Sequence, residues 1–171
     1  MKKPVQTACV ILHNVRSAAN VGSILRTCDA AGVSKIFLTG YTPAPLDRFG
    51  RERRDLTKAS LGAERTVSWE KKRDAGALIE RLAREGMYVV GVEQGSGSHD
   101  YRTLTPSYPV AFVFGNEVRG LSKELRAFSD VLIEIPMRGA VVRQAHHPRH
   151  TGRGKESLNV SVAAGIVLFS A

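Results

Sequence analysis

The sequence predicts an α/β domain built on a largely parallel sheet with helices on both faces. Short apolar runs alternate with helix-like segments along most of the 171 residues. The run at residues 110–114 is apolar at every position, which is typical of a strand buried on both sides. Because parallel strands are joined by helical crossovers, this alternation favours a sheet that helices cover on both faces.

The first half of the chain opens with an apolar strand at residues 7–13. A helix is expected at 21–31, where apolar residues recur at helical spacing. A strand at 35–39 leads into a basic loop at 40–54 that contains two prolines. A short helix at 55–60 and a strand at 66–69 follow.

The second half continues the alternation. An amphipathic helix at 74–85 ends at Gly86, and the strand at 88–93 precedes a flexible Gly- and Ser-containing segment at 94–98. After the buried strand at 110–114, Ser122 is a suitable N-cap for a helix that runs to Phe128. A strand at 131–135 stops at Pro136, and an apolar helix is expected at 158–169.

A chain of this length is expected to form one domain, residues 1–171, with a sizeable core. Its 25 Lys and Arg residues against 16 Asp and Glu give a formal net charge of +9, which favours nucleic acid as a partner. Cys9 and Cys28 lie in apolar segments and are expected to be buried free thiols. No membrane-length or signal-like apolar run follows the basic start, so we expect a cytoplasmic protein without a membrane partner.

The stretch Asn20-Val-Gly-Ser-Ile-Leu-Arg26 follows the first strand, at the end where ligands bind in α/β sheets. Residues six apart do not share one helical face. We therefore expect Asn20 in the turn and Arg26 one turn into the helix, with both side chains facing one crevice. A guanidinium in that place suits a phosphate or a carboxylate. The alternatives are a helix cap for Asn20 and a surface ion pair for Arg26.

Two further segments complete a pattern. Residues 114–122 read Phe-Gly-Asn-Glu-Val-Arg-Gly-Leu-Ser directly after the buried strand, and residues 135–139 read Ile-Pro-Met-Arg-Gly. Ser-Leu-Asn-Val-Ser at 157–161 opens the last helix. With the turn at 20–26, these motifs resemble, in the same order, those of the SpoU/TrmH branch of the SPOUT methyltransferases. The resemblance covers the whole chain.

This resemblance implies a C-terminal trefoil knot in the parallel sheet, and homodimers with RNA lying across the subunit boundary. The implied activity is methylation of a ribose 2′-hydroxyl in tRNA or rRNA, with S-adenosylmethionine as cofactor. The positions that match the family's cofactor-binding loops are Gly115, Ile135, Met137 and Leu158. The positions that match its functional side chains are Asn20, Arg26, Glu117, Ser157 and Asn159.

These residue types suit methyl transfer to a hydroxyl, because the cofactor supplies the reactivity and the protein positions groups and controls charge. Arg26 matches the residue proposed as the base in the family. A guanidinium rarely gives up its proton, so we favour a role in clamping a phosphate and stabilising the alkoxide. Asn20 and Asn159 would orient the reacting groups. Ser157 would bond the ribose or, like Asn159, cap the last helix, and Glu117 would order its own loop or act directly.

The basic loop is the candidate contact with RNA. Phe49 and Tyr41 interleave with its arginines and would stack on bases, whereas the alternative is a solvated basic face. The candidate RNA-binding residues are Arg16, Arg48, Arg51, Arg53 and Arg54.

The chain departs from the family pattern at residues 140–154, which separate Ile-Pro-Met-x-Gly from Ser-Leu-Asn. Arg138-Gly139 recurs as Arg153-Gly154, so we interpret these residues as an insertion in a loop that would wall the cofactor site. A second hypothesis follows from it, an RNA-binding protein of the same fold whose catalysis is impaired or lost.

Two other classes of site are not expected. His146, His147 and His150 have no Cys or carboxylate beside them in the insertion, so we predict no metal. No Gly-x-Gly-x-x-Gly follows the first strand, which excludes a nicotinamide-binding Rossmann site.

Deleting residues 140–154 should restore the family spacing and tighten S-adenosylmethionine binding, measured by calorimetric titration. The fold and the dimer should survive the deletion, because a surface insertion costs little closure entropy. A deletion variant that loses cofactor affinity or fails to fold would show that these residues are an integrated part of the site.

Overall fold

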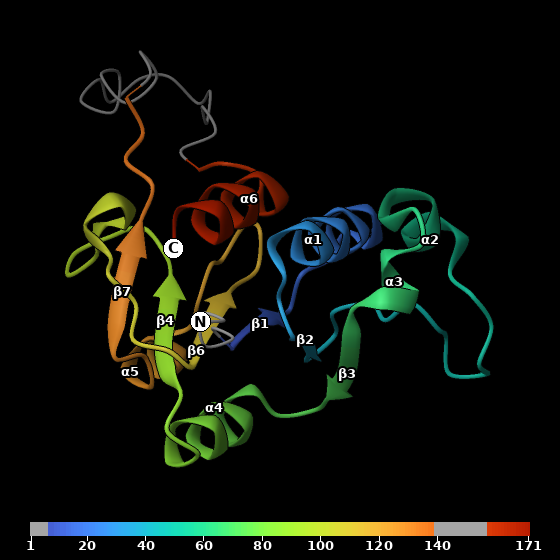
Figure 1. The fold of residues 1–171 in the computed structure, drawn as a ribbon, viewed down its shortest axis with the longest axis horizontal. Coiled ribbons are helices and arrows are strands. Elements are labelled where there is room, and N and C mark those ends of the chain that lie inside the picture. Colours follow the sequence, from blue (N-terminus) through green and yellow to red (C-terminus); the bar gives the residue numbers. More distant parts are fainter. Residues whose placement is uncertain (1–6, 139–156) are drawn as a thin grey trace, which may run out of the picture.

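The computed structural model describes residues 7–138 and 157–171. Their strands form a single parallel sheet. Its strand order is β3-β2-β1-β6-β4-β7-β5, and every neighbouring pair runs parallel (Figure 1). The strands are β1 Ala8–His13, β2 Lys35–Thr39, β3 Ser68–Lys72, β4 Tyr88–Val92, β5 His99–Asp100, β6 Val110–Phe114 and β7 Val131–Glu134. The predicted parallel sheet is confirmed.

Helices cover both faces of this sheet, as the alternation predicts. The helices are α1 Ala18–Ala31, α2 Arg54–Ser60, α3 Ala63–Thr66, α4 Ala75–Arg84, α5 Lys123–Ala127 and α6 Val160–Ser170. Helices α1, α2, α3 and α6 pack into one core cluster, and α4 and α5 into the other (Figure 1). None of the helices in the described ranges has the length and apolar character needed to cross a membrane.

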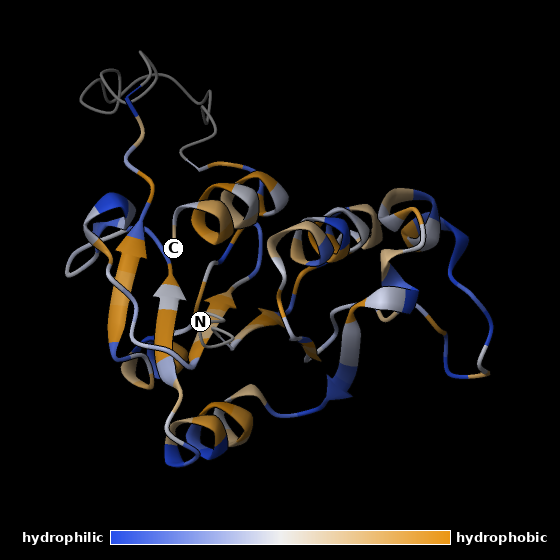
Figure 2. Cartoon of the chain, in the orientation of Figure 1, coloured by the Kyte–Doolittle hydropathy of each residue, from blue (hydrophilic) through white to orange (hydrophobic). Residues whose placement is uncertain are grey.

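The two central strands, β1 and β6, contribute to both clusters. Along β1, Val10 and Leu12 face one cluster while Cys9 and Ile11 face the other. All five residues of β6 are buried. Figure 2 shows the consequence: the middle strands are hydrophobic along their length, while the loop at 40–54 is mostly hydrophilic. Both cysteines are free and buried, and burial raises the pKa of the Cys9 thiol to about 12.

Helix α1 begins earlier than the spacing predicts. Its N-cap is Ser17, whose hydroxyl accepts a hydrogen bond from the backbone N–H of Asn20 at 3.2 Å. Asn20 therefore lies in the first turn of the helix and not in the turn before it. Ser17 and not Asn20 is the cap, because a serine oxygen three residues upstream satisfies the free N–H of the first turn.

The fold also has short elements that the sequence pattern does not predict. Residues 63–66 form the one-turn helix α3, so β3 begins at Ser68 and not at residue 66. The two-residue strand β5 pairs with β7 beyond the Gly- and Ser-containing segment. Elements this short have no hydrophobic periodicity from which to predict them.

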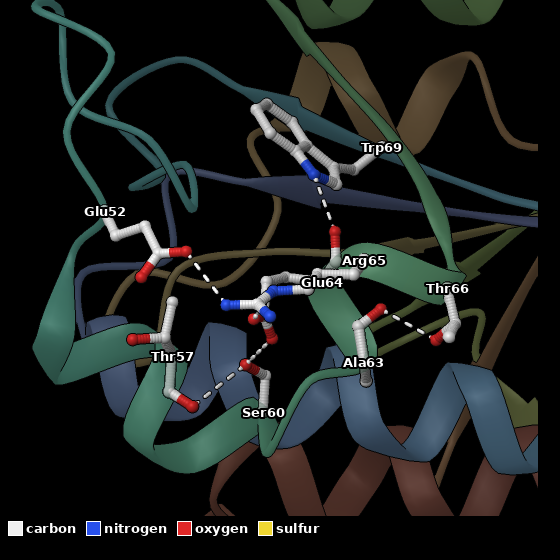
Figure 3. A network of polar contacts seen from close by, with 8 residues as sticks. All are labelled: Glu52, Thr57, Ser60, Ala63, Glu64, Arg65, Thr66 and Trp69. Carbon is white, nitrogen blue, oxygen red and sulfur yellow. Dashed lines mark hydrogen bonds and ion pairs between the residues drawn. The ribbon is translucent and has the colours of Figure 1, made fainter.

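A polar network holds α2, α3 and β3 together (Figure 3). The Glu64 carboxylate, only 7% exposed, accepts a short hydrogen bond from the hydroxyl of Ser60 at the end of α2. The indole N–H of Trp69 in β3 donates to the Glu64 carbonyl oxygen at 3.2 Å. Arg65 lies 3.1 Å from Glu52, which belongs to the basic loop. The network thus ties this loop to the edge of the sheet.

Helices α1 and α2 approach each other closely at Gly22. A Cβ atom at this position would overlap the carbonyl oxygen of Leu56 and lie 2.8 Å from the Cβ of Ala59. The absence of a side chain at Gly22 therefore lets the backbone of α2 pack directly on α1.

Two predictions concern residues outside the described ranges. The trefoil knot depends on the path of residues 139–156, and the proposed insertion at 140–154 lies within them. Both remain predictions.

Candidate functional site

A cavity of about 430 Å³ lies at the carboxyl ends of β4, β6 and β7, beside the start of α6. Of the predicted cofactor-binding residues, Gly115, Ile135 and Leu158 line it. Met137 lies two residues beyond Ile135 and is not among the lining residues that the structure describes. Cavities of about 300–1,000 Å³ are the size that small-molecule ligands occupy.

The loop after β6 forms one wall of the cavity, and glycines shape it. A Cβ atom on Gly115 would lie 2.5 Å from the carbonyl carbon of Gly120 and 2.7 Å from the backbone nitrogen of Leu121. A Cβ atom on Gly120 would overlap the carboxylate of Glu93. The loop at 115–121 closes this tightly because neither position carries a side chain.

Asn116 holds this loop in place, and the sequence analysis did not single it out. Its Oδ1 accepts from the backbone N–H of Val118 at 2.9 Å and of Arg119 at 2.8 Å. Its Nδ2 donates to the Asn14 carbonyl oxygen and to the Tyr41 hydroxyl, both at 2.9 Å. The available signal was a lone amide directly after an apolar strand, where it must find partners when buried.

Glu117 joins the loop after β6 to the start of α1. Its carboxylate accepts hydrogen bonds from the backbone N–H of Arg16 at 3.0 Å and of Ser17 at 3.2 Å. Burial raises the pKa of the Glu117 carboxyl. Its hydrogen bonds lower the pKa by more than burial raises it, and they come from the backbone of Arg16, of Ser17 and of Glu117 itself and from the Asn20 side chain. The net pKa lies below the ordinary value, so the group is ionised at neutral pH.

The ionised carboxylate also fixes the orientation of two asparagines. A carboxylate only accepts hydrogen bonds, so Asn20 must turn its Nδ2 toward Glu117, where the two atoms lie 3.2 Å apart. The Oδ1 of Asn20 then accepts from the Nδ2 of Asn159 at 3.2 Å. Asn159 in turn caps α6, since its Oδ1 accepts from the backbone N–H of Ser161 at 2.8 Å. Three predicted site residues from distant segments thus form one line of hydrogen bonds.

The remaining two predicted catalytic residues lie apart from this line. Ser157 is exposed and lines the cavity. Arg26 is exposed on α1 and does not line the cavity. None of the hydrogen bonds and ion pairs among residues 7–138 and 157–171 involves its guanidinium. Both Asn20 and Arg26 are in one helix, at about 120° from each other around its axis, so a single chain does not point them into one crevice.

The predicted RNA-binding arginines occupy two places. Arg16 is exposed beside Glu117. Arg48, Arg51 and Arg54 are exposed in or just after the basic loop. Arg53 is half-buried at the N-cap of α2, with its Nε 3.7 Å from Asp55. The loop lies beyond α1 and α2, on the side of the molecule away from β7 (Figure 1).

Within the described part of the chain, no group of three His, Cys, Asp or Glu side chains is arranged to hold a metal ion. The three histidines of the proposed insertion lie outside that part.

Known proteins resemble this chain in sequence. Residues 7–143 match the profile of the SpoU rRNA Methylase family. A protein of Vibrio vulnificus named 23S rRNA (guanosine-2′-O-)-methyltransferase RlmB is 32% identical over all of this chain and 61% of its own length. The putative TrmH family tRNA/rRNA methyltransferase YacO of Bacillus subtilis is 30% identical over 98% of this chain and 59% of its own length. The chain therefore spans about three-fifths of these relatives.

Solved structures share the fold. The AdoMet-bound rRNA methyltransferase of Sinorhizobium meliloti superposes with a TM-score of 0.76 at 33% identity, over 96% of this chain and 55% of that one. The TrmH/SpoU tRNA modifying enzyme of A. aeolicus superposes with a TM-score of 0.77 at 27% identity, over 98% of this chain and 75% of that one.

Replacing Glu117 with Gln should lower the free energy of unfolding at pH 7 by about 1–2 kcal/mol, because hydrogen bonds to a charged acceptor are lost. The folded pKa of Glu117 lies below its ordinary value. Its stabilisation is therefore fully present above the unfolded pKa, about 4.3, and is lost as the pH falls through the folded pKa. The difference between parent and variant should shrink below about pH 4.

Denaturant unfolding at several pH values measures this difference. Glu80→Gln, at an exposed position of α4, is the matched control and should unfold with nearly the same free energy as the parent. A Glu117→Gln variant as stable as the parent at pH 7 would mean that the carboxylate does not hold the start of α1.

Proposed function

The chain belongs to the SpoU rRNA Methylase family, and from this we propose that it transfers a methyl group from S-adenosylmethionine to a ribose 2′-hydroxyl of tRNA or rRNA. One observation carries the proposal. The hydrogen-bonded line from Glu117 through Asn20 to Asn159 joins three family motifs beside the cavity. The two relatives are named for methylation of RNA, which supports the same class of reaction here.

The chemistry of the cavity fits the cofactor. Glu93, Glu117 and Glu134 line it, and carboxylates suit a ligand that carries a positively charged sulfonium. Peptide groups of the loop at 115–121 and of Ile135 and Leu158 would hold the cofactor, in place of long side chains. When bound, S-adenosylmethionine supplies an activated methyl group. The S. meliloti structure with this fold is named as AdoMet-bound.

The chain's own residues would then position the RNA. Asn20, with its amide held by Glu117, would orient the ribose. Ser157 at the cavity would bond a ribose hydroxyl. Arg26 would clamp a phosphate and stabilise the charge that develops on the 2′-oxygen.

A homodimer would explain two features of the isolated chain. Helix α6 is apolar on all sides: Val160, Ala164 and Val167 are buried, but Val162 is 49% and Phe169 is 65% exposed. An unpaired apolar helix face is typical of an interface. Arg26 stands on α1, which packs beside α6, so a two-fold contact there would place it near the partner's site.

The segment 140–154 supports a second candidate, an RNA-binding protein of the same fold in which catalysis is impaired or lost. The family match ends at residue 143, inside this segment, as an interruption of the cofactor loop would produce. Titration with S-adenosylmethionine separates the two, because only the enzyme should bind the cofactor. A cytoplasmic location, where tRNA and rRNA are found, fits either candidate.

Purified protein should transfer labelled methyl groups from S-adenosylmethionine to unmodified tRNA or rRNA, and mapping of ribose methylation should identify one nucleotide. Arg26→Ala should lower turnover by about a hundredfold to a thousandfold while keeping cofactor affinity, because one charge-stabilising group is lost. Arg26→Lys should recover only part of the activity, since an ammonium lacks the planar fork.

The control is Arg73→Ala, an exposed arginine between β3 and α4 that should not matter. Parental turnover in Arg26→Ala would remove Arg26 from the reaction. Absence of methyl transfer by the parent to any tRNA or rRNA would overturn the proposed function.

Light scattering should find a dimer at micromolar concentration, and Val162→Asp should convert it to a monomer by placing a charge in the apolar contact. Leu61→Asp, at another exposed apolar position in the α2–α3 turn, is the control and should remain dimeric. A parent protein that is monomeric under these conditions would contradict the assembly.

A further inference from the structure

We propose that the tip of the basic loop, residues 47–51, holds an unpaired nucleobase of the RNA against Phe49. The inference rests on the proposed function and adds a second contact, distinct from the reacting ribose. It also names the kind of RNA element that the contact recognises.

The tip is a preformed turn. Its two sides are joined by an antiparallel bridge between Leu46 and Glu52, and the backbone N–H of Asp47 donates to the Arg51 carbonyl oxygen at 2.9 Å. The Oδ1 of Asp47 accepts from the backbone N–H of Phe49 at 2.8 Å and of Arg51 at 2.9 Å. Gly50 supplies the left-handed conformation, with φ of 76°, that closes the turn. Binding would therefore need little further ordering of the backbone.

This turn presents an aromatic ring with two cations over it. Phe49 is 66% exposed. The guanidinium carbons of Arg48 and Arg51 lie 4.7 Å and 5.5 Å from its ring centroid. Both guanidinium groups lie over the ring, and Phe49 nevertheless remains largely exposed. A stacking base would take the place of a guanidinium group on the ring. The two cations are then placed to contact the adjoining phosphates.

The tip is also fixed to the body of the protein. At its base the backbone N–H of Arg53 donates to the Pro45 carbonyl oxygen at 2.9 Å. Glu52 pairs with Arg65 at 3.1 Å, and Arg65 belongs to the network in Figure 3 that reaches Trp69 in β3. The backbone that carries Phe49 is therefore anchored to the sheet and is not a free chain.

An unpaired base is the ligand that this chemistry fits. In a duplex the flat faces of the bases are covered by their neighbours, and the protein meets phosphates and groove edges. Aromatic rings flanked by basic side chains are typical of proteins that stack single-stranded bases. A duplex would use the arginines alone and leave Phe49 without a function.

The contact lies away from the reacting ribose. The loop projects beyond α1 and α2, while the cavity lies at the ends of β4, β6 and β7 (Figure 1). An RNA that reaches both would present an unpaired nucleotide at a distance from the methylated one.

The first experiment compares two RNA probes of equal nucleotide number, a stem-loop with an unpaired loop and a blunt duplex, by fluorescence anisotropy at several salt concentrations. Phe49→Leu should weaken stem-loop binding roughly tenfold and leave duplex binding unchanged, because only the stack is lost. Phe49→Tyr, which keeps the ring, should bind as the parent does. The slope of log affinity against log salt should not change in Phe49→Leu, whereas Arg51→Gln should reduce it by about 1.

The second experiment separates shape from charge at Asp47. Asp47→Ala removes a negative charge, so electrostatics alone would strengthen RNA binding. It also removes the acceptor that orders Phe49 and Arg51, so the proposal expects severalfold weaker stem-loop binding. Asp47→Asn loses the same charge but keeps Oδ1, and it should bind at least as tightly as the parent.

Two results would overturn the inference: equal stem-loop affinity for Phe49→Leu and the parent, or tighter binding by Asp47→Ala. If the parent methylates RNA but either result is found, the proposed function stands and this contact falls. If the parent neither binds nor methylates RNA, both fall together.

Discussion

The site depends on the contact between the Glu117 carboxylate and the start of α1. One acceptor-only group receives two backbone N–H groups of the loop after β1 and the amide of Asn20. Negative charge at a helix N-terminus is favourable, so the contact also stabilises α1. Through Asn20 it sets the orientation of Asn159 at the start of α6. The ionised carboxyl of Glu117 thus links the ends of β1 and β6 directly and, through Asn20, the start of α6.

A second constraint is the tight closure of the loop after β6. The Glu93 carboxylate accepts from the backbone N–H of Leu121 and, at 3.1 Å, of Gln94, and Arg126 lies 3.6 Å away. This carboxylate fills the space that a side chain on Gly120 would need. The Glu93 carboxylate and the two glycines together keep this loop tightly closed where it lines the cavity.

Much of the architecture follows from the sequence because each central strand is continuously apolar. The apolar run at 110–114 coincides with β6, and the strand predicted at 35–39 coincides with β2. The motif residues Glu117, Asn20 and Asn159 were named from their pattern, but their mutual hydrogen bonds were not, since 97 and 139 residues separate the partners. The sequence predicts Asn20 outside α1, because residue spacing alone does not show which polar residue of the turn caps the helix. In the structure the cap is Ser17. The role of Asn116 depends on Asn14 and Tyr41, which only the folded sheet brings to it.

The close approach at Gly22 has a consequence for selectivity. Helix α2 follows directly from the basic loop and rests on the backbone of α1, with no side chain at Gly22 between them. A larger residue there would push α2 and the tip of the loop outward, away from Asn20 and Arg26. If the chain acts on RNA as proposed, the thickness of this interhelical contact would set the distance between the loop tip and Asn20 and Arg26 that the RNA has to span. A residue that touches no nucleotide would then help decide which RNA shapes are accepted.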